Sequence, residues 1–236
     1  MELPIPLLAI TPLNGLNYNS AMQQISPGVF MHSNASIYQY LIVENGQITL
    51  IDTGLPIFWR SLIRTITNMD HQAVLNLILI THADGDHYGS AKQLFGTYHC
   101  PIAASALEAA AIRSGRMSRE LKPRNAFDRL LFSAALPLFT VAAVPVEQII
   151  EPGQILPLLG GLQVLDSAGH TPGHLSFYQS ERQILFAGDS IIKRRNAPSP
   201  AHGPNCWDEV RAREAFERQM ALKPQHICGG HSYFRI

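Results

Sequence analysis

Short apolar runs bounded by turn residues dominate the first third of the chain and predict β-strands. Residues 38–44 (YQYLIVE) and 47–51 (QITLI) flank Asn45-Gly46, a dipeptide that strongly indicates a tight hairpin. Residues 75–80 (LNLILI) form an uninterrupted apolar run of strand length, which is typical of a buried strand. We predict further strands at residues 28–31, 101–104, 148–150, 163–165, 175–178, 183–186 and 226–228.

Helical spacing of apolar residues appears between these strands. Residues 56–69 carry a proline near their start and an apolar face that includes Ile57, Leu62 and Ile66, which predicts an amphipathic helix. Residues 208–222 are predicted to form another helix, with Asp208 in position to cap its start. Two further helices are predicted, one starting at residues 90–95 and one at residues 105–113.

The order of the predicted elements is strands, helix, strand and helices, followed by strands, helix and strand. This order favours the α/β class and a four-layer αββα sandwich, in which two β-sheets pack together and helices cover their outer faces. We expect residues 1–236 to form a single domain. A basic segment at about residues 113–140 breaks the pattern and is predicted to be a partly helical insertion.

Positive charge gathers in this insertion and in the run Lys193-Arg194-Arg195. Charge runs usually mark solvated faces, and a solvated surface is the interpretation we favour. The alternative is a lid that attracts an anionic substrate, with Arg194 and Arg195 as substrate contacts. The cationic residues of the insertion include Arg116, Arg119, Lys122, Arg124 and Arg129.

Composition narrows the classes of partner and the compartment. The formal net charge is zero, so no overall field attracts nucleic acid or an anionic membrane. The three cysteines form no CxxC pair, which argues against a disulfide framework and a cysteine zinc site. The N-terminal residues lack a basic region and contain Pro4, Pro6 and Pro12, which argues against a signal peptide. We therefore expect a cytoplasmic protein with neither nucleic-acid nor membrane partners.

Metal-ligating residue types occur where predicted strands end. Imidazole and carboxylate groups are ligands for zinc, iron and manganese, and loops after strand ends expose side chains to a cleft. In the first such loop, His82 and Asp84 are spaced to hold one metal, and the adjacent Asp86 and His87 a second. Gly85 relieves backbone strain between them. The candidates are His82, Asp84, Asp86, His87, His170, Asp189 and His231.

These motifs, from Asp52-Thr-Gly to His231, resemble the metallo-β-lactamase superfamily, whose ligand loop reads HxHxDH and is followed by a histidine, an aspartate and a histidine. The resemblance covers nearly the whole chain and implies the αββα fold and a two-metal centre. By this resemblance, the first metal would be held by His82 and His170. The second would be held by Asp86, His87 and His231. The carboxylate that bridges both metals would be Asp189. It also places Asp52 behind the ligand loop as an orienting carboxylate, and His174 near the site.

Asp84 departs from the family pattern, which has a histidine at this position. We interpret Asp84 as a substituted metal ligand; the alternative is a degenerate site that has lost one metal. A third aspartate would bring the centre close to neutral, weaken the first metal as a Lewis acid and raise the pKa of its bound water. Zinc is the expected metal, and oxygen ligands make iron or manganese an option beside it.

The implied reaction is attack by a metal-bridging hydroxide on a small carbonyl substrate, which is an ester, lactone, thioester or amide. Lactonase and thioesterase activity come first among these. Asp86 and Asp189 are the predicted catalytic carboxylates, and Tyr88 is either a substrate contact or a packing residue. A glyoxalase II-like enzyme is not expected, because the sequence ends five residues after His231 without the C-terminal helical domain of that type.

Two other classes of function stay open. Di-iron members of the superfamily that reduce oxygen or nitric oxide carry a glutamate at the position of Asp84, which makes a redox enzyme one alternative. A metal-binding protein without turnover is the other. The sequence leaves the oligomeric state open, with a homodimer as one option.

Overall fold

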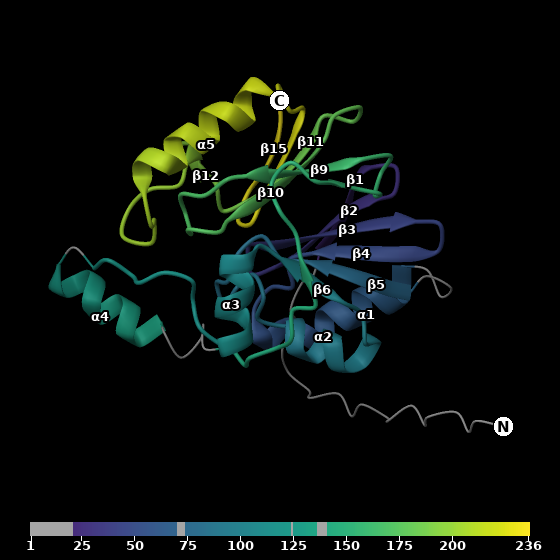
Figure 1. Ribbon diagram of the computed structural model, residues 1–236, viewed down its shortest axis with the longest axis horizontal. Helices are drawn as coiled ribbons and strands as arrows, with labels where there is room; N and C mark the ends of the chain where they lie inside the picture. Colours follow the sequence, from purple (N-terminus) through teal and green to yellow (C-terminus); the bar gives the residue numbers. More distant parts are fainter. Residues whose placement is uncertain (1–20, 70–73, 124, 136–140) are drawn as a thin grey trace.

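Two β-sheets lie face to face at the centre of the molecule in a computed structural model of the chain (Figure 1). The structure describes residues 21–69, 74–123, 125–135 and 141–236, so the predictions for the N-terminal segment and for Arg124 lie outside the described residues. Helices cover the outer face of each sheet (Figure 1). The predicted four-layer αββα sandwich is therefore confirmed.

The first sheet combines an antiparallel meander with parallel strands. Its strands run in the order β1-β2-β3-β4-β5-β6-β7, antiparallel from β1 to β4 and parallel from β4 onward. Asn45 and Gly46 both have positive φ angles, which the tight β3–β4 hairpin requires. The strands are β1 (Ala21–Ser26), β2 (Val29–Asn34), β3 (Ile37–Glu44), β4 (Gln47–Ile51), β5 (Val74–Leu79), β6 (Ile102–Ala104) and β7 (Gln148–Ile149).

The second sheet supplies the other half of the sandwich. Its strand order is β15-β14-β11-β10-β9-β8, and only the β11–β14 pair is parallel. Buried residues of both sheets, such as Ile42, Leu79, Phe177 and Phe186, form the core between them. The strands are β8 (Ile155–Leu156), β9 (Leu162–Asp166), β10 (Leu175–Gln179), β11 (Ile184–Gly188), β14 (His226–Gly229) and β15 (Tyr233–Arg235).

The outer helices bury apolar stripes on their sheets. In the first helix Leu62 and Ile66 are buried as predicted, but Ile57 lies in the preceding 3-10 turn and is 63% exposed. On the other side, Phe216 and Met220 of α5 pack against the second sheet, and Asp208 caps α5 through two backbone amides. The elements are η1 (Pro56–Phe58), α1 (Trp59–Met69), α2 (Ala91–Tyr98), α3 (Ala106–Ser114) and α5 (Glu209–Ala221).

Two segments lie outside the sandwich. Within the basic insertion, α4 (Ala126–Ala135) projects from the body of the molecule (Figure 1). After Asp189, β12 (Ile191–Arg194) pairs with β13 (Ala197–Pro200) in a small hairpin that carries prolines in its second strand. A two-stranded edge tolerates prolines that a central strand would not. Among the described helices, none has the length and apolar character needed to cross a membrane.

Candidate metal centre

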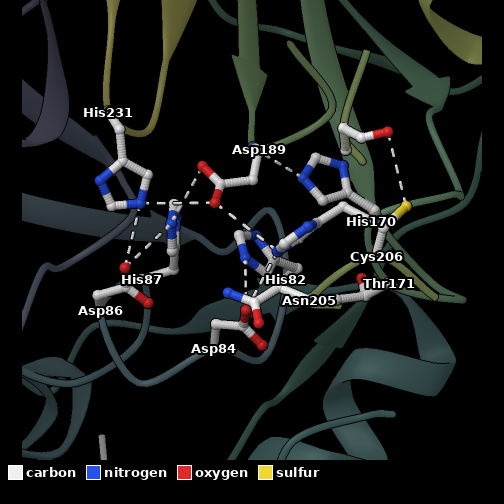
Figure 2. A network of polar contacts seen from close by, with 12 residues as sticks. His82, Asp84, Asp86, His87, His170, Thr171, Asp189, Asn205, Cys206 and His231 are labelled. Carbon is white, nitrogen blue, oxygen red and sulfur yellow. Dashed lines mark hydrogen bonds and ion pairs between the residues drawn. The ribbon is translucent and has the colours of Figure 1, made fainter. Parts of the chain in front are cut away.

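Loops at the ends of four strands bring the predicted ligands together at one edge of the sandwich. The loop after β5 carries four of them, and the loops after β9, β11 and β14 carry one each. The side chains converge from both sheets on a common space (Figure 2). The predicted ligands that meet there are His82, Asp84, Asp86, His87, His170, Asp189 and His231.

Six of these residues form two triads. Within each triad, the potential ligand atoms lie within 4.8 Å of one another. The first triad is His82, His170 and Asp189, and the second is Asp86, His87 and His231. Asp189 faces both: its Oδ2 lies 3.7 Å from Nε2 of His170 and 3.5 Å from Nε2 of His231. A carboxylate placed between two groups of ligands has the position that a bridging ligand needs.

Three potential ligand atoms in this space are buried without a hydrogen-bond partner among the described residues: Nε2 of His82, Nε2 of His87 and Oδ1 of Asp189. Unpaired buried polar atoms are costly, and each such atom in a native structure calls for a missing partner. Imidazole nitrogens and carboxylate oxygens without thiolates suit zinc, iron or manganese. The residues present therefore fit a pair of divalent metal ions.

Opposite charges within the centre shift the pKa values of its histidines and aspartates. Burial would lower the pKa of His87, but Asp189, Asp52 and Asp86 raise it well above its usual value. Asp189 raises the pKa of His231 to about 10, against the effect of burial. Burial would raise the pKa of Asp189, but His231 and His87 hold it well below the usual range. The carboxylates are thus ionised, and metal binding would displace protons from the imidazoles.

Asp52 and His174 stand directly behind the triads. Asp52 Oδ2 lies 2.8 Å from Nδ1 of His87 and accepts a hydrogen bond from the Thr81 hydroxyl, while its Oδ1 accepts one from the Thr81 amide. His174 Nε2 accepts a 3.1 Å hydrogen bond from the amide of Asp189. Burial holds the pKa of His174 well below its usual value, so its ring is neutral. Each contact fixes the orientation of a neighbouring potential ligand.

The family model described as Metallo-beta-lactamase superfamily matches residues 34–231. The chain belongs to the metallo-beta-lactamase superfamily. This match confirms the resemblance drawn from the motifs, because it spans every predicted ligand from His82 to His231.

Curated relatives of this superfamily member are distant. An uncharacterized protein of Bacillus subtilis, YobT, is 26% identical over 83% of this chain and 82% of its own length. The probable metallo-hydrolase YflN of the same organism is 23% identical over 80% of this chain and 76% of its own length. The hydroxyacylglutathione hydrolase GloC of Haemophilus influenzae is 29% identical over 56% of each chain.

Solved structures share the superfamily fold. The subclass B3 metallo-beta-lactamase BJP-1 of Bradyrhizobium japonicum has a TM-score of 0.63 at 19% identity, with 89% of this chain and 77% of that chain covered. A metallo-beta-lactamase from Pontibacter korlensis has a TM-score of 0.64 at 15% identity, with 92% and 94% covered. At these identities the likeness shows the fold alone.

At position 84, where the superfamily loop pattern predicts histidine, this member carries an aspartate that pairs with Arg119. Nη1 and Nη2 of Arg119 donate to the two carboxylate oxygens of Asp84 at 2.5 and 2.8 Å. Asp84 Oδ2 also lies 3.2 Å from Nε2 of His170. The expectation of a solvated surface is therefore wrong for Arg119, whose side chain is 2% exposed, although it holds for the exposed Arg116 and Arg129.

Glu108 is a second residue that sequence reasoning missed. Its buried carboxylate accepts hydrogen bonds from the amide of Ala83 at 2.7 Å, the hydroxyl of Thr171 at 2.7 Å and the amide of Gly173 at 2.9 Å. It therefore ties the first ligand loop to the loop that carries His170. The sequence offered one signal, the acidic residue three positions after the helix cap Ser105, but that pattern predicts a local contact.

The three predicted substrate contacts lie in different settings. Tyr88 is 2% exposed and belongs to the core between the first sheet and its helices, which supports the packing interpretation. Arg194 and Arg195 are exposed at the turn of the β12–β13 hairpin, where Arg195 has a positive φ angle.

The three cysteines, Cys100, Cys206 and Cys228, are free and buried, as the absence of a disulfide pattern predicted.

Proposed function

We propose that the protein is a binuclear metallo-hydrolase that cleaves a small carbonyl substrate, with thioesters as the first class to test. The observation that carries this proposal is a set of buried atoms that lack a hydrogen-bond partner and lie within ion-pair distance of neighbouring site residues: Nε2 of His82, Nε2 of His87 and Oδ1 of Asp189. Bound divalent ions would lower the pKa of water toward neutrality and polarise the substrate carbonyl. Zinc is the proposed metal, with iron and manganese as the alternatives.

The chain's own residues hold and orient this centre. His82, His170 and Asp189 form the first site, and Asp86, His87 and His231 form the second, with Asp189 between them. Asp52 and His174 are positioning residues, since one contacts His87 and the other the amide of Asp189. Asp86 and Asp189 are the proposed catalytic carboxylates, because both lie close to Nε2 of His231 and are ionised.

Among the proposed ligands, the side chain of His231 is the most exposed. The side chains of His82 and His87 are 0% exposed, whereas that of His231 is 40% exposed. We propose that a substrate approaches from the side of His231 and meets the second site first.

The thioester class rests on relatives. The curated relatives include an atrochrysone carboxyl ACP thioesterase of Cryptosporiopsis, 24% identical over 86% of this chain and 49% of its own length. They also include hydroxyacylglutathione hydrolases, whose named substrate is an acyl thioester. Esters, lactones and amides stay in the proposed range, because the same centre would polarise any of these carbonyls.

The test is a substrate panel with protein loaded separately with zinc, iron or manganese. Acyl-glutathione and acyl-pantetheine thioesters, lactones, nitrophenyl esters and a cephalosporin would be assayed beside metal analysis. We expect turnover of at least one class and a loss of about 1,000-fold in His87→Ala, with the exposed His99→Asn unchanged. Protein with two bound metals and no turnover would overturn the hydrolase proposal and leave a metal-binding role.

A further inference from the structure

The Asp84–Arg119 ion pair lies at the edge of the first metal site and has no place in the superfamily loop pattern. We propose that Arg119 defines the ligand set of the first metal: it keeps Asp84 as a counter-ion outside that set, and leaves His82, His170 and Asp189 as the protein ligands. This inference rests on the proposed binuclear centre. It makes Arg119 a positioning residue and replaces the interpretation of Asp84 as a substituted ligand.

The geometry of the pair is the first support. Both oxygens of Asp84 accept from Arg119, one from each terminal nitrogen, which is the bidentate arrangement of a strong guanidinium–carboxylate pair. Oxygens engaged in this way are weaker electron-pair donors toward a metal. Asp84 lies close enough to His170 and His82 to influence the site, with Oδ2 at 3.2 and 3.5 Å from their Nε2 atoms.

Arg119 is itself held in place. Its Nε donates to the carbonyl of Asn205 at 2.8 Å, and Nζ of the nearby Lys122 donates to the carbonyl of Trp207 at 2.8 Å. The amide of Trp207 in turn donates to the carbonyl of His170 at 3.0 Å. The guanidinium is therefore anchored to the same loop that contacts a first-site residue, and it does not depend on Asp84 alone for its position.

Charge is the second support. Asp84 alone would lower the formal charge of the centre by one unit, and the buried guanidinium restores that unit. A guanidinium group stays protonated throughout the physiological pH range, so Arg119 carries this compensating charge. The first metal then experiences about the field it would have beside a neutral residue at position 84. The weaker Lewis acid predicted from three aspartates does not follow.

A double-mutant cycle tests this inference through metal affinity. Asp84→Asn, Arg119→Leu and the double variant would be compared with the wild type in the full-length protein, with Arg116→Ala as the exposed control from the same segment. Stepwise affinities for zinc would come from competition with a chelator. Cobalt-loaded protein would give the visible absorption spectrum as a signature of coordination, and thermal melting would confirm that each variant folds.

We expect Asp84→Asn to weaken the first site by about tenfold, because Arg119 is left as an uncompensated charge. Arg119→Leu frees Asp84 to ligate, so it tightens the first site by about tenfold and changes the cobalt spectrum. The double variant removes two cancelling charges and returns to within about threefold of the wild type. The second site is unchanged throughout.

A double variant as weak as Asp84→Asn would overturn the inference, since Asp84 would then be a ligand in the wild type. This outcome leaves the hydrolase proposal intact. Conversely, a protein that binds two metals but hydrolyses nothing defeats the proposed function while the cycle still decides the role of Arg119. A wild type that binds a single metal equivalent overturns both the inference and the binuclear centre.

Discussion

Asp52 and His87 lie 35 positions apart, yet Oδ2 of Asp52 sits 2.8 Å from Nδ1 of His87. Asp52 has a positive φ angle of 59°, so the chain accepts an unfavourable backbone conformation to place this carboxylate at the end of β4. The same carboxylate binds the amide and hydroxyl of Thr81, next to His82. One side chain therefore fixes the start of the candidate ligand loop and the ring of His87, a proposed ligand within it.

Replacement of this carboxylate tests its role. We expect Asp52→Asn to reduce zinc affinity at the second site by 10- to 100-fold, roughly, because the amide is a weaker partner for Nδ1 of His87. Isothermal titration with zinc would measure the loss. Asp208→Asn is the matched control, since asparagine still caps α5. An unchanged affinity in Asp52→Asn would show that the ring of His87 is held by other contacts.

Gly230 leaves no room for a side chain beside the centre. A Cβ atom at this position would overlap Oδ1 of Asp189 and Cε1 of His87. We expect Gly230→Ala to fold but to bind metal at least about tenfold more weakly, because both potential ligands must move. Gly96→Ala is the control, since nothing lies within 4 Å of its added carbon. Equal metal content in the two variants, measured by elemental analysis, would contradict this account.

Glu108 offers a test of how the two ligand loops are tied together. We expect Glu108→Gln to lower the free energy of unfolding by about 2 kcal/mol, because a neutral amide is a poorer acceptor for three donors and brings hydrogens of its own. Urea denaturation of metal-free protein would measure this change. The exposed Glu120→Gln should differ from the wild type by less than about 0.5 kcal/mol. A Glu108→Gln variant as stable as the wild type would show that Glu108 does not stabilise the contact between the two loops.

His32 provides a pH-dependent term in stability away from the centre. Burial lowers its pKa to about 4, from 6.5, so the folded state holds it neutral. Its contribution of about 3 kcal/mol is present above pH 6.5 and is lost as the pH falls toward 4. Urea denaturation at several pH values should show this loss in the wild type relative to His32→Gln, but not relative to His99→Asn. A difference that stays constant with pH would argue against a buried neutral ring.

Much of the fold and the centre was accessible from local sequence signals. Asn45-Gly46 predicted its hairpin because only a few residue pairs tolerate two positive φ angles. His170 and Asp189 were found because each lies in the loop that follows a predicted strand. In these cases neighbouring residues carry the information, and the strand ends then meet because the two sheets pack together.

The missed features depend on contacts between distant residues. Arg119 resembles its exposed neighbours in sequence, and only the approach of Asp84, 35 positions away, distinguishes it. Glu108 has a local explanation as part of a helix cap, which hides its bonds to Thr171 and Gly173, 63 and 65 positions away. The pairing of Asp84 with a guanidinium was missed for the same reason, because Arg119 comes from a segment without a recognisable motif.

The proposed ligands are divided between the two halves of the sandwich: three follow β5 of the first sheet and three follow strands of the second. A bound pair of ions would act as an inorganic cross-link between layers that also meet through apolar packing and hydrogen bonds, such as that from the Tyr40 hydroxyl to the carbonyl of Gly229. Removal of the ions would then weaken the association of the two sheets, in addition to removing the metals from the proposed active site. The midpoint temperature of thermal unfolding would rise with metal concentration. The stability of the folded protein would therefore depend on the metal available to it.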